Sequence, residues 1–489
     1  MIQKRHLGIA VAIVAVGFFL RVAIALQWQN AISGGTPFRF GDSDSYWMMA
    51  KKVAQGLPYQ YGSPDSKIFR APLYPLFLSP WTWIDGTSVR PSWGAVVAAR
   101  IAGCAMGALC IAILILLGNK LFRRQDPKQG FAIGIWAGLL AGLYPGAIGM
   151  SVFVLSEAIF CPLMLLSLGC VSFAIRAKNE ARWEVAWSWM LSSGALSGAA
   201  CLARPSWSLW PAVLFSYLIV LMVQGKRQFH SYREGECREG EAPAREGEAP
   251  AEPKPSSAGA PLSHRTAWRW LFGCVLYCVG ICLVMSPWWA RNYLETGKFV
   301  PTTLQVGASL YDGWHAGASG SSDEGMGFVN AFIVEQKNED QRELLAGKKL
   351  ESTLEWRVDR RMKNAAIAWA LENSSNAARL GLVKLVKTWS PLPVARELGS
   401  DAVRWFEAIG YTAIMGLAAI GMWQCRSQLG AWLYAMPCVY FALLHMFFIG
   451  SVRYRQPAVL VICVLGGVGC ATIARWVFSK PEKVKPRGG

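Results

Sequence analysis

About ten runs of roughly 20 mainly apolar residues recur along the chain, and they restrict what it can fold into. The hydrocarbon core of a bilayer is about 30 Å thick, and a helix rising about 1.5 Å per residue crosses it with about 20 residues. With 53% hydrophobic and 16% charged residues, the chain is too apolar for an ordinary soluble enzyme. The sequence therefore predicts an all-α integral membrane protein of about ten transmembrane helices, at about 7–26, 95–117, 131–147, 156–175, 185–203, 207–223, 270–288, 403–423, 431–449 and 457–478.

Basic residues lie mainly in short segments between these runs, so we interpret the net charge of +18 as a topology signal and not as a nucleic-acid-binding surface. The first run follows Lys4, Arg5 and His6, and no small-residue cleavage pattern comes after it, which favours an uncleaved anchor. If each run crosses once, the basic segments share one side with both termini. The positive-inside rule makes that side cytoplasmic, and we expect the protein in the inner cell membrane.

Three long connections and a basic tail separate the apolar runs. The segment 224–267 repeats Arg-Glu-Gly-Glu and is rich in Pro and Gly, which predicts a disordered cytoplasmic linker between transmembrane modules at 1–223 and 268–478. The connections 27–92 and 290–402 fall on the opposite, outer side and contain amphipathic stretches. We expect the basic tail 479–489 in the cytoplasm. The 13 cysteines lie mostly inside apolar runs without disulfide or zinc-ligand spacing, so no metal site is predicted from them.

The first outer connection carries two acids, Asp42 and Asp44, before a stretch with helical periodicity from Tyr46 onward. Apolar residues at 46, 49, 50, 53, 54 and 57 predict an amphipathic helix along the membrane. Either acid could be an N-cap that accepts backbone N–H groups. A helix N-terminus also keeps a carboxylate ionised, so the same residue could accept a proton in catalysis.

One further acid and several arginines recur at predicted outer helix ends. Glu157 begins the fourth run, where it either stabilises the helix dipole or belongs to a catalytic site. A single arginine at a helix end can simply extend to the interface, but several on the side that positive charge disfavours suggest a phosphate-bearing lipid as partner. These arginines are Arg204, Arg291, Arg453 and Arg455. Arg70 lies within the first outer connection, two residues before Pro72, and is either a headgroup contact or a phosphate ligand.

In this order the motifs resemble those of the GT-C glycosyltransferases, in particular the bacterial relatives of the dolichyl-phosphate-mannose protein mannosyltransferases and the lipid A aminoarabinose transferase. The resemblance rests on Asp42 four residues before Tyr46, Arg70-x-Pro72-x-Tyr74-Pro75, Ser156-Glu157, Ala203-Arg204-Pro205, Pro287-Trp288 with Arg291-Asn292, Gly307 with Tyr311, and Arg453-Tyr454-Arg455-x-Pro457. The chain departs from the family at Ser43, where relatives often have adjacent acids, and near Asn373-Ser-Ser-Asn376, where they often have a proline.

The resemblance implies a GT-C-like helical bundle and inverting transfer of a hexosyl or pentosyl group. The donor would be a polyprenyl-phosphate sugar, and the acceptor a hydroxyl of a lipid, glycan or protein on the non-cytoplasmic face. It implies Asp42 as general base, with Asp44 as second candidate and Glu157 as a third acid of the catalytic site. The implied substrate and phosphate ligands are Arg70, Tyr74, Arg204, Arg291, Asn292, Arg453 and Arg455. No cofactor is required by this mechanism.

Two other interpretations remain open. Asp42-Ser43-Asp44 is formally a DxD motif, which in soluble glycosyltransferases holds a metal and a nucleotide sugar, although nucleotide sugars are cytoplasmic. A polyprenyl-lipid flippase or transporter, or another membrane protein of envelope assembly, would also use arginines near the membrane. Transporters often have inverted repeats and Gly/Pro-broken spans at matching positions, and the sequence has no evident pair of these.

Overall fold

The computed structural model describes residues 2–32, 37–63, 65–86, 88, 90–122, 127–223, 264–322, 326–392 and 401–478. The predicted linker 224–267 and tail 479–489 lie outside these residues, apart from 264–267. Secondary structure in the described part is helical, which confirms the predicted all-α class. Eight of the described helices are long and apolar enough to cross a membrane, namely Arg5–Ala31, Trp93–Phe122, Glu157–Asn179, Pro205–Val223, Ala267–Thr296, Asp401–Gln424, Gly430–Phe447 and Val452–Phe478.

The remaining two of the ten predicted spans, 131–147 and 185–203, are not among these eight helices. The helices α5 (Pro127–Leu143) and α6 (Pro145–Val152) form one apolar pair that bends by 62° at Tyr144. Pro145 occupies the first turn of α6, where its missing N–H costs no intrahelical bond. The helix α8 (Trp183–Ala203) is less apolar than the eight but packs between α7 (Glu157–Asn179) and α10 (His264–Thr296). The chain is therefore a multi-pass membrane protein. Within the described residues, the bent pair α5–α6 is either a broken span or a re-entrant loop, and we call it the broken span below.

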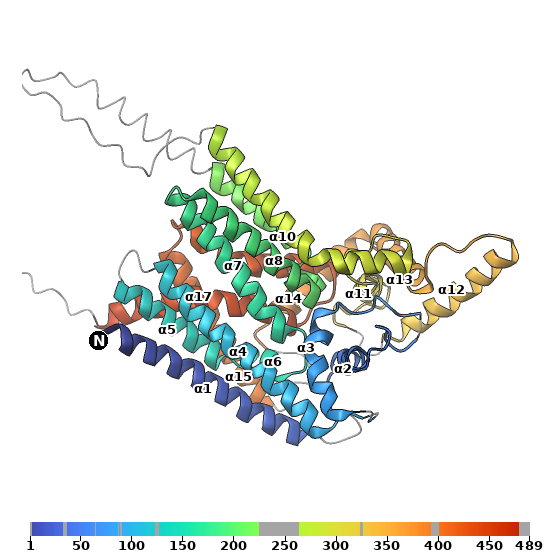
Figure 1. Cartoon of the computed structure of the whole chain (residues 1–489), viewed down its shortest axis with the longest axis horizontal. Helices are drawn as coiled ribbons and strands as arrows, with labels where there is room; N and C mark the ends of the chain where they lie inside the picture. The colour runs from blue at the N-terminus through green and yellow to red at the C-terminus, as the bar shows by residue number, and fades with distance from the viewer. Residues whose placement is uncertain are drawn as a thin grey trace, which may run out of the picture.

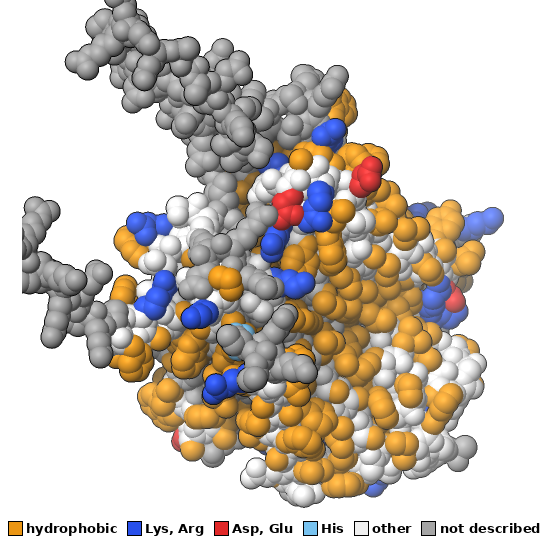
Figure 2. All heavy atoms as spheres, turned by 60° about the vertical axis from the view of Figure 1, so that its left-hand side comes forward, with side chains coloured by type: hydrophobic (Ala, Val, Ile, Leu, Met, Phe, Trp, Pro, Cys, Tyr) orange, Lys and Arg blue, Asp and Glu red, His pale blue; other side chains and the backbone are white. Residues whose placement is uncertain are grey.

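The helices run side by side in a bundle, with α17 (Val452–Phe478) buried along most of its length between α5, α15 (Asp401–Gln424) and α16 (Leu429–Phe447) (Figure 1). Hydrophobic side chains cover much of the bundle surface that Figure 2 presents. Soluble monomers rarely expose continuous apolar surface of this extent, whereas a lipid-facing surface requires it.

Short helices from the two long connections gather at one end of the bundle, which we call the loop end (Figure 1). They are α2 (Gly41–Ala54), α3 (Leu73–Thr82), α11 (Val306–Gly313), α12 (Phe328–Leu345), α13 (Leu354–Glu372) and α14 (Ser374–Trp389). The amphipathic helix predicted from Tyr46 begins five residues earlier, at Gly41, and its N-cap is Phe40. Neither acid is thus the N-cap; Asp42 and Asp44 both lie in the first turn of α2.

Candidate active site

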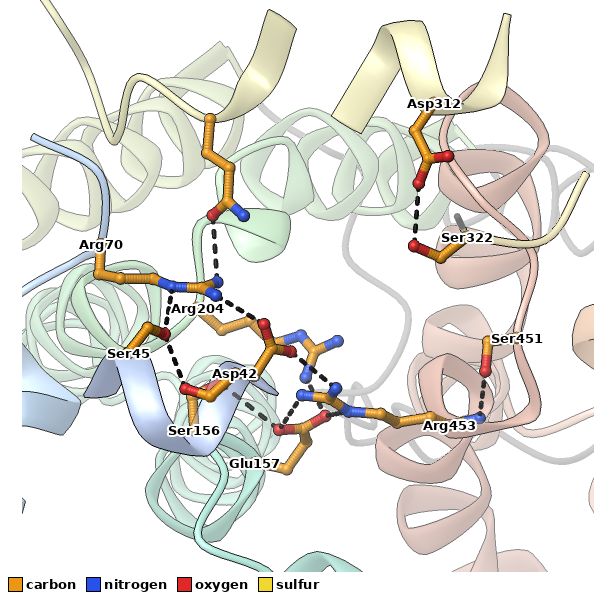
Figure 3. A network of polar contacts seen from close by, with 11 residues as sticks. Asp42, Ser45, Arg70, Ser156, Glu157, Arg204, Asp312, Ser322, Ser451 and Arg453 are labelled. Atoms are coloured by element: carbon orange, nitrogen blue, oxygen red, sulfur yellow. Dashed lines mark hydrogen bonds and ion pairs between the residues drawn. The ribbon is translucent and has the colours of Figure 1, made fainter. Parts of the chain in front are cut away.

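The carboxylate of Asp42 lies between two guanidinium groups at the loop end (Figure 3). Its Oδ1 is 2.5 Å from Arg70 Nη2 and its Oδ2 is 2.8 Å from Arg453 Nη1. Arg70 also donates to Ser45 Oγ at 3.1 Å and to Gln305 Oε1 at 3.1 Å, and its guanidinium lies over the ring of Tyr46. Arg70 therefore joins the first turns of α2, the segment before α3 and the residue that precedes α11.

Glu157 forms a second, deeper pair of contacts. It begins α7, and its carboxylate is 2.5 Å from Arg204 Nη1 and 2.6 Å from Arg453 Nε. Arg453, in the first turn of α17, thereby bridges both acids, as Figure 3 shows. Five residues that are scattered over the sequence form one charged cluster: Asp42, Arg70, Glu157, Arg204 and Arg453.

The charges in this cluster do not cancel, because three guanidiniums face two carboxylates. Burial alone would raise the pKa of Asp42, but the positive charges of Arg70 and Arg453 outweigh it and hold that pKa well below its usual range. Asp42 is thus ionised at neutral pH. The cluster carries one positive charge in excess, which suits an anionic ligand.

The two acids of the first turn of α2 are separated by the fold. Asp44 makes no ion pair with a described residue, and burial raises its pKa. The 2.5 Å contact of Asp42 with Arg70 has no counterpart at Asp44, which lies two residues further along the helix and points in a different direction. Of the two candidates, Asp42 alone is brought into the cluster.

Four of the predicted substrate and phosphate ligands lie outside the cluster, and two of them, Arg291 and Asn292, belong to the end of α10. Arg291 lies against the rings of Tyr59 and Trp288 and donates to the carbonyls of Tyr59 and Lys67. Asn292 is fully buried and donates to the carbonyl of Val300 at 3.0 Å. Their contacts fasten the end of α10 to the connections around it.

Tyr74 and Arg455 also have supporting positions. Tyr74 is buried, with its ring edge-on to that of Tyr46. Arg455 is completely buried, lies 3.6 Å from the ring centre of Tyr411 and donates to the carbonyls of Thr388 and Ser390. It therefore anchors the end of α14 to α17.

Residues not identified from the sequence hold Arg70 and Gln305 in place. Glu355 accepts the backbone N–H groups of Lys67 at 2.9 Å and Ile68 at 3.0 Å, just before Arg70. One turn further along α13, Asp359 accepts the N–H of Gly307 at 2.7 Å, just after Gln305. Their signal in the sequence is two acids four residues apart, which lie on one face of α13.

These two carboxyls predict that α13 docks less firmly as pH rises. Burial raises the pKa of Glu355 to about 7 and that of Asp359 to about 6. Because both values exceed those of unfolded chains, their stabilising contribution is complete below about pH 4 and is lost as pH rises through about 6 to 7. We expect the thermal midpoint of the purified protein to fall over this interval, and less so in Glu355→Gln. Exposed Glu351→Gln is the matched control, and an unchanged pH profile in Glu355→Gln would contradict the assignment.

Fold and site together define a class: multi-pass helical membrane proteins with paired acids and arginines at one end of the bundle. No protein-family model matches the chain, and no curated protein matches it either. Among solved structures, the chain is similar to the archaeal oligosaccharyltransferase AglB from Archaeoglobus fulgidus in complex with an inhibitory peptide and a dolichol-phosphate. The identity is 12% and the TM-score 0.48, over 99% of this chain and 53% of that one.

It is also similar to ArnT from Cupriavidus metallidurans. For the apo state the identity is 14% and the TM-score 0.36, and for the state bound to undecaprenyl phosphate they are 15% and 0.35. Each comparison covers 96% of this chain and 81% of ArnT. The chain spans about half the length of the oligosaccharyltransferase.

Proposed function

We propose that the chain is an inverting glycosyltransferase that moves a sugar from a polyprenyl-phosphate carrier to a hydroxyl acceptor, with Asp42 as general base. The proposal rests mainly on one difference between the two acids of the cluster. The side chain of Asp42 is 34% exposed, whereas that of Glu157 is 0% exposed. An acceptor hydroxyl can therefore approach Asp42 but not Glu157, which serves to hold Arg204 and Arg453.

The reaction is a single displacement. Asp42 takes the proton of the acceptor hydroxyl while its oxygen forms a bond to the anomeric carbon of the sugar. The bond from that carbon to the phosphate oxygen breaks, and its electron pair leaves with the polyprenyl phosphate. Attack from the face opposite to the leaving group inverts the configuration.

The leaving phosphate needs cations and no proton donor, because the second pKa of a phosphate ester is about 6. We assign this role to Arg204, with Arg70 and Arg453 next to it. Arg204 borders the ring of Tyr454 and donates to Ser206 Oγ, at the junction of α8 with the span that follows. The single positive charge in excess matches one phosphate anion.

A metal is not part of this mechanism, although Asp42-Ser43-Asp44 has the spacing of a DxD motif. Both oxygens of Asp42 already contact guanidiniums, so a cation shared with Asp44 would have to displace them. Transfer activity should persist at its full rate in excess EDTA. Loss of activity in EDTA that Mg²⁺ or Mn²⁺ restores would reject the metal-free mechanism.

The positive-inside pattern places the active site on the non-cytoplasmic face, with both termini in the cytoplasm. A cysteine introduced at Gly56, at the exposed end of α2, should react with a membrane-impermeant maleimide in intact cells. A cysteine in place of Arg426, at the opposite end of the bundle, should react only after the membrane is opened. The reverse labelling pattern would contradict this orientation.

The broken span α5–α6 supports one alternative, because helices broken by Gly and Pro line the translocation sites of many transporters. The described residues contain no second such bend. Purified protein in liposomes separates the two functions. A transferase converts polyprenyl-phosphate sugar and acceptor into product, whereas a flippase moves a fluorescent polyprenyl-phosphate analogue across the bilayer and forms no product.

A further inference from the structure

Arg21 is an arginine within an apolar span, and no part of the proposed reaction uses it. It lies in α1 (Ile2–Ala31) and is only 1% exposed. Its Nη2 donates to the carbonyl of Ala141 at 2.9 Å, its Nη1 to the carbonyl of Gly142 at 3.0 Å, and its Nε to Ser151 Oγ at 3.3 Å. No described acid forms an ion pair with it.

The carbonyls of Ala141 and Gly142 lie at the end of α5, next to the break, and Ser151 lies near the end of α6. The last carbonyls of a helix have no intrahelical donor, and within a membrane no water replaces it. A guanidinium at a helix C-terminus satisfies the carbonyls and matches the helix dipole. Arg100 of α4 (Trp93–Phe122) does the same at the end of α6, where it donates to the carbonyl of Val152 at 2.7 Å. In each half of the broken span, the carbonyls at the C-terminal end thus accept hydrogen bonds from an arginine of a neighbouring helix.

The α6 half is also fitted closely against α4. A Cβ on Gly107 would lie 2.1 Å from Ser151 Oγ and 2.8 Å from Arg21 Nε, and one on Gly103 would lie 2.4 Å from the Ser151 carbonyl. Two glycines four residues apart let helix backbones approach closely in membranes. Ser151 and Arg21 therefore occupy fixed positions against α4.

Glu157 begins α7 five residues after α6 ends. A cavity of about 10 Å³, about the size of one water molecule, is lined by Arg21, Ser151 and Glu157 together. We infer that Arg21 is a positioning residue. Its hydrogen bonds hold α6 in place against α5 and thereby fix the position of Glu157, which in turn orients Arg204 and Arg453. Naming those arginines as phosphate ligands rests on the proposed function, but the link from Arg21 to Glu157 does not.

Hydrogen exchange tests that link without any substrate. In Arg21→Lys, which keeps the charge but loses the fork of donors, amide exchange in residues 145–157 should become at least about tenfold faster, with α8 unchanged. Ser151→Ala is a milder variant that should show a smaller increase in the same segment. Ser172→Ala removes an equally buried serine hydroxyl in α7 and is the matched control. Unchanged exchange in 145–157 in both variants would overturn the inference.

A double-mutant cycle tests whether Arg21 acts through Glu157. The dissociation constant of undecaprenyl phosphate is measured for the wild type, Arg21→Lys, Glu157→Gln and the double variant, together with the thermal midpoints. We expect the effects on binding to be non-additive by at least about twofold. Additive effects would overturn the inference and leave the proposed function standing. If the wild type does not bind undecaprenyl phosphate, the phosphate site fails, and non-additive thermal midpoints would still support the positioning role.

Discussion

Replacing Asp42 with Asn is expected to slow sugar transfer by about 10²- to 10⁴-fold, the range that a general base contributes. The amide has nearly the shape of the carboxylate but cannot take the proton of the acceptor. It also adds one positive charge to the cluster, so binding of the polyprenyl phosphate should persist or strengthen. In product-formation assays in detergent, the rate constant should therefore fall, whereas the Michaelis constant for the donor should stay the same or decrease.

Asp44→Asn is the matched control for Asp42→Asn, because it makes the same change two residues away in the same helical turn. We expect a rate within about tenfold of the wild type, since Asp44 makes no ion pair with a described residue. Full activity in Asp42→Asn, or equal losses in the two variants, would reject Asp42 as the base.

Arg453→Lys is expected to reduce transfer by about 10²- to 10³-fold, comparable to removing a donor that stabilises a developing anion. The three nitrogens of Arg453 serve both acids at once: Nη1 contacts Asp42, while Nε and Nη2 contact Glu157. A single ammonium cannot span both carboxylates. Glu157 is completely buried and keeps Arg204 as a partner, so loss of the hydrogen bonds from Arg453 should also lower stability by about 1.5 to 3 kcal/mol.

Arg39→Lys is the control for this substitution, because Arg39 is exposed and its guanidinium lies over the ring of Trp28, outside the cluster. It should leave both activity and thermal midpoint unchanged. Product formation reports the first effect of Arg453→Lys, and thermal unfolding in detergent reports the second. A fully active and stable Arg453→Lys protein would contradict the bridging role.

The spans were largely predictable, because hydropathy over about 20 residues is a local property. The break in the third predicted span was not foreseen, although Tyr144-Pro145 marks it. The carbonyls that the break exposes accept hydrogen bonds from Arg21, a single arginine within an apolar run of α1. Whether such an arginine meets lipid or a broken helix is decided by a neighbouring helix more than 100 residues away.

The sequence identified the arginines of the candidate site, but only the structure showed their different partners. Five were singled out, yet Arg291 and Arg455 support the surrounding loops, while Arg70, Arg204 and Arg453 pair with Asp42 and Glu157. In the sequence four of them look alike, since Arg204, Arg291, Arg453 and Arg455 each stand at the end of an apolar run. Their different partners come from packing, so the pattern alone could not assign their roles.

By itself, the sequence determined that this chain crosses a membrane several times and that acids and arginines stand at the ends of its helices. These are local properties of composition and spacing. Only the tertiary structure decided that Asp42 meets Arg453, 411 residues away, and that Asp44 does not. The physical reason is that ion pairs form over a few ångströms, and only the packed bundle brings residues so distant in sequence within that range.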